Sequence, residues 1–177
     1  MKGFILIGAP GSGKSSVGKA LARELNASYL DTDAKIVTVA GKHIPDIFAE
    51  LGEAGFRKIE REVVLNALVS DVEIISLGGG SIVDPLTQAA VSTNDRSVIY
   101  LTVGIGNAVA RISDKADRPL VADDPKNQWL SLVAKREPIY ERLADLKVST
   151  DNRKAPEVAH EIVLKMLKMG EGGHSDE

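Results

Sequence analysis

The sequence predicts a single α/β domain in which a parallel sheet is covered by helices on both faces. Two observations support this. Apolar runs alternate with helical periods along the whole chain, and the first run leads directly into a glycine-rich loop and a helix, "FILIGAPGSGKSSVGKAL" at 4–21. Such alternation is typical of parallel sheets. Because ligands of these sheets bind beyond the carboxyl ends of the strands, residues 8–15, 31–33 and 77–80 form the candidate site.

Five segments predict the strands: "FILIG" (4–8), "SYLDTD" (28–33), "VEIISLGGG" (72–80), "SVIYLTV" (97–103) and "KVST" (147–150). Apolar residues at helical spacing predict a helix directly after the first loop. Further helices are expected between Ile44 and Leu68, with breaks near Gly52 and Gly55, and at 107–112, 129–146 and 155–169.

Composition limits the classes of function. The chain has 177 residues, 44% of them hydrophobic, which is enough for one domain with a real core, placed at 1–169. The net charge is −3, so there is no basic excess that would attract a nucleic acid. The absence of cysteine excludes disulfides and thiolate metal sites. The polar, glycine-rich residues 170–177 predict a disordered tail.

The N-terminus superficially resembles a signal peptide, because Lys2 precedes the apolar "GFILIGAP". The apolar stretch is too short, however, and the glycine-rich loop interrupts it. No segment approaches the roughly 20 apolar residues that span a bilayer. We therefore expect a cytoplasmic protein without a membrane partner.

Residues 8–15, "GAPGSGKS", match the Walker A pattern G-x-x-x-x-G-K-[ST]. Its glycines let backbone N–H groups surround a phosphate, and the next helix adds its positive N-terminal end. Lys14 can reach the β- and γ-phosphates of a nucleoside triphosphate, and the Ser15 hydroxyl can bind Mg²⁺. A strand before the loop and a helix after it are the context that this mechanism requires, so a chance match is disfavoured.

The second strand ends in Asp31-Thr32-Asp33. On extended backbone the two carboxylates share a face, so one could support Mg²⁺ while the other takes a proton from a substrate hydroxyl. The structural alternative is that Asp31 ends a strand and Asp33 caps a helix. Beside a phosphate-binding loop the functional interpretation is favoured.

Two further segments have competing interpretations. Arg57 and Glu60 stand one helical turn apart and could form an ordinary exposed ion pair. The three glycines at 78–80 are costly as a mere turn, which favours a close approach of the backbone to a ligand.

Arginines mark the remaining candidates. Arg118 lies in a charged stretch, and a loop of that length is typical of an active-site lid, expected at about 113–127. Arg136 precedes a proline inside a helical pattern, which would constrain where its side chain points. Taken alone, each is better explained as a surface residue.

The Walker A loop, "DTD", "FRKIE", "GGG", "RPL" and "REPIY" occur in an order and at spacings that resemble the shikimate kinase family. The resemblance covers about residues 2–169. It implies a three-layer P-loop NTPase fold of the nucleoside monophosphate kinase type, with a central five-stranded parallel sheet. It also implies the ATP-dependent conversion of shikimate to 3-phosphoshikimate in chorismate biosynthesis by a cytoplasmic monomer, with Mg²⁺ as cofactor.

The resemblance also implies roles for individual residues. The catalytic residues are Asp33 as base, Lys14 and Arg118, and the metal is held by Ser15 and Asp31. ATP is bound by Gly11, Ser12, Gly13, Lys14, Ser15, Ser16, Arg111, Arg118, Arg153 and Pro156. Shikimate is bound by Asp33, Phe48, Phe56, Arg57, Glu60, Gly78, Gly79, Gly80 and Arg136, with the two arginines on its carboxylate and Glu60 orienting Arg57.

Two other functions remain alternatives. Another small-molecule kinase of this fold, for gluconate or a nucleoside monophosphate, also needs a P-loop, and gluconate has both a carboxylate and hydroxyls. A non-catalytic ATP-binding regulator is the alternative from a different class. The joint presence of D-T-D, F-R and G-G-G favours a shikimate kinase over the first. The candidate base, together with Arg57, Arg136 and Arg118 of the lid, favours an enzyme over the second.

Overall fold

The computed structural model describes residues 3–113 and 124–172. A five-stranded, all-parallel sheet forms the centre, in the order β2-β3-β1-β4-β5. Its strands are β1 (Phe4–Ile7), β2 (Tyr29–Asp31), β3 (Ile74–Ser76), β4 (Ser97–Thr102) and β5 (Leu146–Ser149). This confirms the predicted fold class.

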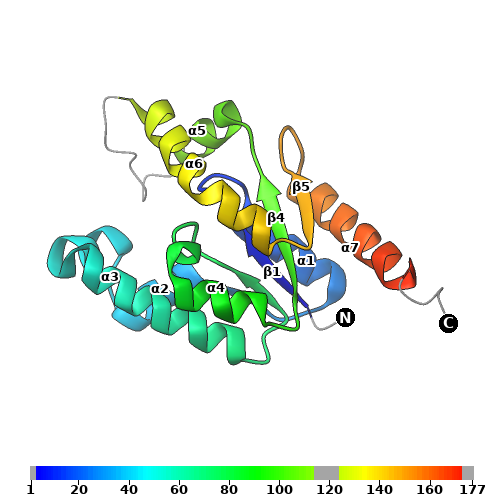
Figure 1. Cartoon of the computed structure of the whole chain (residues 1–177), viewed down its shortest axis with the longest axis horizontal. Coiled ribbons are helices and arrows are strands. Elements are labelled where there is room, and N and C mark those ends of the chain that lie inside the picture. The colour runs from blue at the N-terminus through cyan, green and yellow to red at the C-terminus, as the bar shows by residue number, and fades with distance from the viewer. Residues whose placement is uncertain (1–2, 114–123, 173–177) are drawn as a thin grey trace.

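Helices connect the strands and cover both faces of the sheet (Figure 1). They are α1 (Lys14–Leu25), α2 (Thr32–Ala40), α3 (Ile44–Val69), α4 (Pro85–Ser92), α5 (Ile105–Ser113), α6 (Pro125–Leu143) and α7 (Ala155–Gly172), with a short 3₁₀ turn, η1 (Ser81–Val83). The α3 segment is two helices joined at a kink, where Gly52 has a φ of 68°. Of the two predicted breaks, the kink lies at Gly52.

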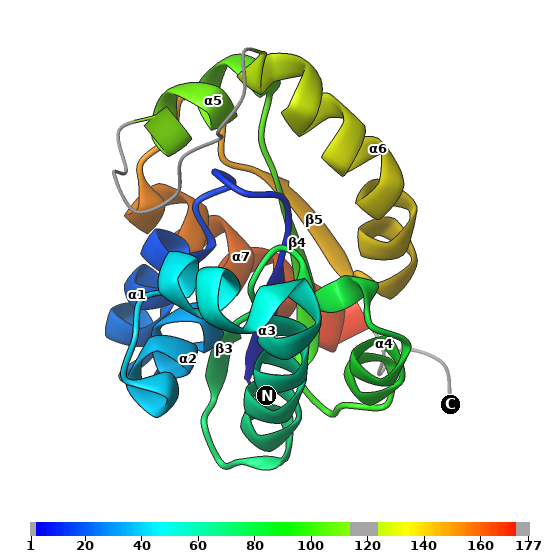
Figure 2. The same ribbon diagram turned by 90° about the vertical axis from the view of Figure 1, so that its left-hand side faces the viewer.

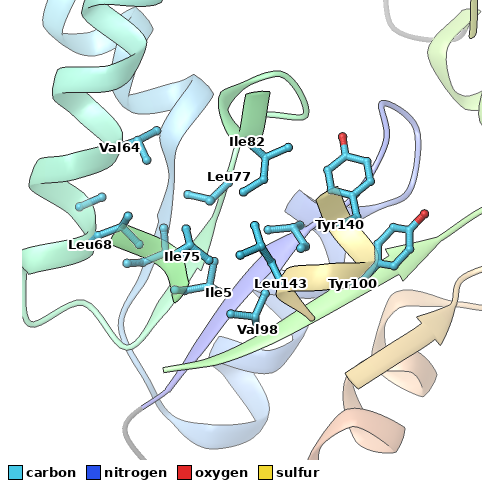
Figure 3. Close-up of a cluster of buried hydrophobic side chains, with 13 residues drawn as sticks. Ile5, Val64, Leu68, Ile75, Leu77, Ile82, Val98, Tyr100, Tyr140 and Leu143 are labelled. Atoms are coloured by element: carbon cyan, nitrogen blue, oxygen red, sulfur yellow. The ribbon is translucent and has the colours of Figure 1, made fainter. Parts of the chain in front are cut away.

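The alternation of side chains along β1 divides the core into two layers. Ile5 and Ile7 point to the face covered by α3, α4 and α6, where they pack with Val64, Leu77 and Tyr140 (Figure 3). Phe4 and Leu6 point to the opposite face, where α1 and α7 cover them through residues such as Leu21 and Ile162. Successive side chains of a strand face opposite sides, so a continuously apolar strand requires this double cover.

Several boundaries differ from the expected ones. The second strand ends at Asp31, and residues 32–33 already belong to α2, because the Asp31 side chain caps that helix. The helix α4 was not expected, α2 was expected only in the alternative in which Asp33 caps a helix, and α6 starts at Pro125 instead of residue 129. The last helix continues to Gly172, so the first three residues of the predicted tail are helical; residues 173–177 lie outside the described part.

The predicted lid at 113–127 falls largely on residues 114–123, which lie outside the described residues, as does Arg118. The loop after β1 lies between α5 and α6 on one side and α2 and α3 on the other (Figure 2). No helix in the described part of the chain is long and apolar enough to cross a membrane.

Candidate active site

The loop between β1 and α1 has a backbone that only glycine adopts easily. Gly8, Gly11 and Gly13 have φ values of 148°, 81° and 86°. A Cβ on Gly8 would lie 2.4 Å from the carbonyl oxygen of Leu101, so the loop also packs too closely for a side chain there. The Walker A glycines are thus explained by the shape of the loop itself.

Lys14 is the first residue of α1, and its side chain folds back over the loop. Its Nζ donates to the carbonyl oxygens of Gly8 and Ala9 at 2.8 and 3.0 Å and contacts the Ser12 hydroxyl at 3.4 Å. The side chain is 9% exposed. A buried ammonium therefore lies at the positive end of a helix, which is an arrangement suited to phosphate.

Ser15 and Asp31 bring two oxygen donors together beside the loop. The Ser15 hydroxyl donates to Asp31 Oδ2 at 2.5 Å, and the Tyr29 hydroxyl lies 3.3 Å from the same carboxylate oxygen. Burial raises the pKa of the Tyr29 phenol, and the Asp31 charge raises it further, so Tyr29 stays a neutral donor. Hard oxygen donors of this kind fit Mg²⁺, which typically takes one or two protein ligands and completes its shell with phosphates and water.

From the sequence, Asp31 and Asp33 were expected to share one face of a strand, and the structure shows that they do not. Asp31 Oδ1 accepts from the backbone N–H groups of Asp33 and Ala34 at 3.0 and 3.3 Å, so Asp31 is the N-cap of α2. Asp33 lies in the first helical turn. The structural alternative was therefore right that an aspartate caps a helix here, but the capping residue is Asp31 and not Asp33.

The Asp33 carboxylate lies against the glycine segment 78–80. A Cβ on Gly78 would lie 2.5 Å from Asp33 Oδ1 and 3.4 Å from Glu60 Oε1. The backbone N–H of Gly78 donates to Thr32 Oγ1 at 2.9 Å, which joins this segment to α2. A side chain at position 78 would therefore displace the Asp33 carboxylate and would come into contact with that of Glu60.

Arg57 and Glu60 form an ion pair on the second part of α3, with 2.6 Å between Nη1 and Oε2. Glu60 is 4% exposed, so the pair is not an ordinary solvated one. Burial raises the pKa of Glu60 and the Asp33 charge raises it too, whereas Arg57 and Arg136 oppose the increase. Asp33, Arg57 and Arg136 thus all lie close enough to influence Glu60.

A side chain at position 80 would displace the guanidinium, since a Cβ on Gly80 would lie 2.7 Å from Arg57 Nη1. The guanidinium carbon also lies 5.3 Å from the centre of the Phe56 ring, which stacks on Phe48 with centroids 4.4 Å apart. Phe56 is buried and Phe48 is exposed. Phe56 thus packs on the Arg57 guanidinium and Phe48 packs on Phe56, and neither ring lines the cavities described next.

Two cavities open at this edge of the sheet. The larger, of about 970 Å³, is lined by the P-loop, Asp31, Asp33, Arg111 and Arg153. The smaller, of about 660 Å³, is lined by residues that include Arg57, Glu60, Gly80 and Arg136. Asp33 lines the first and Glu60 the second, and both carboxylates approach Gly78. The two cavities therefore adjoin at the glycine segment.

Arg136 lines the smaller cavity from α6, and Tyr140, one turn further along this helix, binds the glycine segment. The Tyr140 hydroxyl donates to the carbonyl oxygen of Gly79 at 2.7 Å. Burial raises the pKa of Tyr140 to about 12 against the opposing charge of Arg136, so the phenol remains a donor. Residues from α2, α3, α6 and the glycine segment thus converge on one point.

Of the predicted adenine contacts, Arg111 and Arg153 line the larger cavity together with Lys154 and Ala155. Gly11, Gly13, Ser15 and Ser16 line it as well, and Ser12 is buried inside the loop. Pro156 is exposed on the first turn of α7 and does not line this cavity.

Residues that the sequence did not single out complete the surroundings of the loop. The Trp129 indole N–H, from α6, donates to the carbonyl oxygen of Pro10 at 3.0 Å. Thr150 contacts the loop from the end of β5. Thr150 follows a predicted strand, so the rule that ligands bind at carboxyl ends could have drawn attention to it. Nothing in the local sequence marks Trp129.

A Walker A loop at the carboxyl edge of a parallel sheet, with a carboxylate and paired arginines beside it, defines a P-loop phosphotransferase of the small-molecule kinase type. The family model described as Shikimate kinase matches residues 10–167. Curated shikimate kinases of Thermobifida fusca and Streptomyces coelicolor are 44% and 42% identical, covering 92% and 95% of this chain and 93% and 96% of their own lengths. The chain belongs to the shikimate kinase family.

Solved structures agree with this assignment. A shikimate kinase from Acinetobacter baumannii in complex with shikimate superposes with a TM-score of 0.91 at 28% identity, over 95% of this chain and 94% of that one. A gluconokinase from Sinorhizobium meliloti superposes with a TM-score of 0.59 at 14% identity over 96% and 94% of the two chains, which is a likeness of fold alone. The activity is that of a shikimate kinase, an ATP-using phosphotransferase of the shikimate pathway.

Proposed function

We propose that the two adjoining cavities hold ATP and shikimate, and that the γ-phosphoryl group passes between them beside Asp33. The observation that carries this proposal is the position of Asp33, which lines the nucleotide cavity while touching the segment that borders the smaller one. A candidate base between a phosphate site and a guanidinium pair is the arrangement that transfer to a hydroxyl requires.

The reaction balances with the residues present. Asp33 accepts the proton of the shikimate hydroxyl as its oxygen forms a bond to the γ-phosphorus, and the bond from that phosphorus to the β,γ-bridging oxygen breaks. Lys14 neutralises charge on the phosphates. The products are 3-phosphoshikimate and ADP. Positioning and charge neutralisation account for most catalysis in reactions of this kind.

Arg57 and Arg136 are the proposed partners of the shikimate carboxylate. Planar guanidinium groups bind carboxylates through paired hydrogen bonds that an ammonium cannot reproduce. The buried Glu60 holds Arg57 at 2.6 Å and so orients it toward the cavity. We assign Phe48 and Phe56 a supporting role behind Arg57, because the rings stack on one another outside the cavity.

Ser15 and Asp31 are the proposed protein ligands of Mg²⁺. An ion held by these two residues would reduce the charge on the phosphates of the nucleotide. Among the residues described, no group of three or more acidic or histidine side chains is placed to hold a metal ion. Arg118 and the proposed lid would complete the phosphate site, and we propose a monomer that acts in the cytoplasm.

The test is the release of ADP from ATP with each of several acceptors: shikimate, gluconate, a nucleoside monophosphate and none. We expect release only with shikimate and Mg²⁺ together. Lys14→Ala should remove most of it, because the phosphates lose their buried cation. Equal turnover with gluconate would overturn the substrate, and ADP release independent of any acceptor would overturn the transfer.

A further inference from the structure

Thr150 is a buried residue at the nucleotide cavity to which neither the motif nor the proposed reaction gives a role. It directly follows β5, is 2% exposed, and lines the larger cavity beside Arg111. A buried hydroxyl must have hydrogen-bond partners, so its partners indicate what it does.

The Thr150 hydroxyl lies between three groups. Its Oγ1 is 3.0 Å from the carbonyl oxygen of Ser12 and 3.2 Å from that of Thr102, and it accepts from Arg111 Nη1 at 3.0 Å. A hydroxyl has one proton to donate. The Ser12 oxygen is the nearer of the two acceptors, and the Thr102 oxygen is already bonded to the backbone N–H of Thr150 at 3.0 Å, so we assign the hydroxyl proton to Ser12.

This bond determines the direction of a P-loop amide. The carbonyl of Ser12 and the N–H of Gly13 belong to one planar, trans peptide group and point in opposite directions. Holding the Ser12 oxygen on Thr150 therefore aims the Gly13 N–H to the other side. Gly13, with its φ of 86°, is a residue whose flanking peptides rotate easily, so an outside restraint has a real effect.

Arg111 restrains the preceding peptide from the same side. Its Nη1 donates to the carbonyl oxygen of Gly11 at 3.1 Å, and its Nη2 donates to the carbonyl oxygen of Thr150 at 2.8 Å. Thr150 and Arg111 together thus hold two successive loop carbonyls, those of Ser12 and Gly11. The Thr150 hydroxyl connects the two residues, because it donates to the Ser12 carbonyl and accepts from the Arg111 guanidinium.

We propose that Thr150 is a positioning residue for the nucleotide, which presets the P-loop amides and the Arg111 guanidinium before ATP binds. The inference rests on the proposed function of the larger cavity as the ATP site. None of the hydrogen bonds of the Thr150 hydroxyl goes to a residue that lines the smaller cavity. The proposal therefore requires that loss of this hydroxyl affects the binding of ATP and not the binding of shikimate.

The test compares Thr150→Val, which keeps the shape without the hydroxyl, with Thr150→Ser, which keeps the hydroxyl. Removing one partner from buried hydrogen-bonding groups should weaken binding of Mg·ADP, measured by calorimetry, by about tenfold. The KM for ATP should rise by a similar factor and the KM for shikimate by less than about twofold. Thr150→Ser should be within about threefold of the wild type.

Thr93→Val is the matched control, because its hydroxyl donates to the Ala89 carbonyl on α4, away from both cavities. If Thr150→Val does not fold, Thr150→Ala against Thr150→Ser gives the same comparison. Wild-type affinity for Mg·ADP without the hydroxyl, or equal losses in Ser and Val, would overturn the proposal. Failure of the proposed function is distinguishable, since it would show as wild-type protein that binds Mg·ADP but does not phosphorylate shikimate.

Discussion

Asp31 and Asp33 are two residues apart, yet their surroundings differ. Asp31 is occupied by the Ser15 hydroxyl and by two backbone N–H groups of α2. Asp33 instead faces the glycine segment at the junction of the two cavities. The spacing alone could not divide their roles, whereas their different partners are the reason why we propose Asp31 for the metal and Asp33 for the substrate.

Replacing each aspartate by asparagine should therefore give different kinetic defects. Asp33→Asn keeps the size but removes the proton acceptor, so kcat should fall by about 10²–10⁴-fold. Asp31→Asn should raise the Mg²⁺ concentration needed for half-maximal rate, because a ligand charge is lost. Mg²⁺ titrations at saturating shikimate measure both. An Asp33→Asn variant with a normal saturated rate would show that the base lies elsewhere.

The raised pKa of Glu60 leads to a second prediction, which concerns how the stability of the protein depends on pH. Its pKa is raised mainly by burial, so the folded state holds this proton more tightly than the unfolded chain does. In the window from the ordinary glutamate value up to the raised one, the unfolded state binds fewer protons, and stability falls as pH rises. Glu60→Gln cannot titrate and lacks this contribution.

The measurement is the melting temperature of both proteins from pH 4 to pH 8. We expect the stability of the wild type relative to Glu60→Gln to decrease with increasing pH through that window. The same difference at all pH values would show that Glu60 titrates normally.

Among the structural elements, the glycine segment 78–80 lies beside the proposed base at one end and beside a proposed substrate-binding arginine at the other. A methyl group on Gly78 would meet Asp33, and one on Gly80 would meet Arg57. Neither glycine has a positive φ, so alanine is compatible with the backbone and the clash falls on the side chains. Two neighbouring alanine substitutions should thus separate chemistry from binding.

We expect Gly78→Ala to lower kcat by displacing the base, and Gly80→Ala to raise the KM for shikimate by displacing the guanidinium. Each effect should be at least tenfold, since loss of alignment costs about that much or more. Gly170→Ala, where a Cβ meets nothing within 4 Å, is the control. Indistinguishable kinetic defects in the two variants would contradict this division of the segment.

At the scale of the whole molecule, ligand binding joins elements from both faces of the sheet. The larger cavity, which is the proposed nucleotide site, is lined by residues of α1, α2, α3, α5 and α7, so a protein with this cavity occupied should resist global unfolding. Mg·ADP at 100 times its Kd contributes about 2.7 kcal/mol, which for a chain of this size raises Tm by about 5–10 °C. Differential scanning calorimetry measures the shift. ADP without Mg²⁺ should give a smaller one, and identical shifts would contradict the proposed metal site.

The sheet could be predicted because a buried parallel strand is apolar on both sides, and this pattern is local. The helices α2 and α4 could not be recognised from periodicity, since each is only about two turns long. Their starts were nevertheless marked: Asp31 and Asp84 cap them through their side chains. Attention to caps would have found both helices.

The candidate site could be predicted only in part, for a different physical reason. Motif residues such as Lys14 and Arg57 belong to short local patterns. The bonds from Trp129 to Pro10 and from Tyr140 to Gly79, in contrast, join positions 119 and 61 residues apart. Such pairs exist only once the sheet brings the segments together, so one sequence does not indicate them.

Trp129 has a consequence of a different kind. It is the one tryptophan of the chain, and its indole N–H is bonded to the phosphate-binding loop. Its ring is buried against Ala9, Ala108 and Ile112, the last two on the helix that carries Arg111. Light emitted by this indole therefore originates from a single place, directly behind the nucleotide cavity. This indole is therefore an intrinsic optical probe, and we expect rapid mixing to detect the binding of ATP through it in unlabelled, unmodified protein.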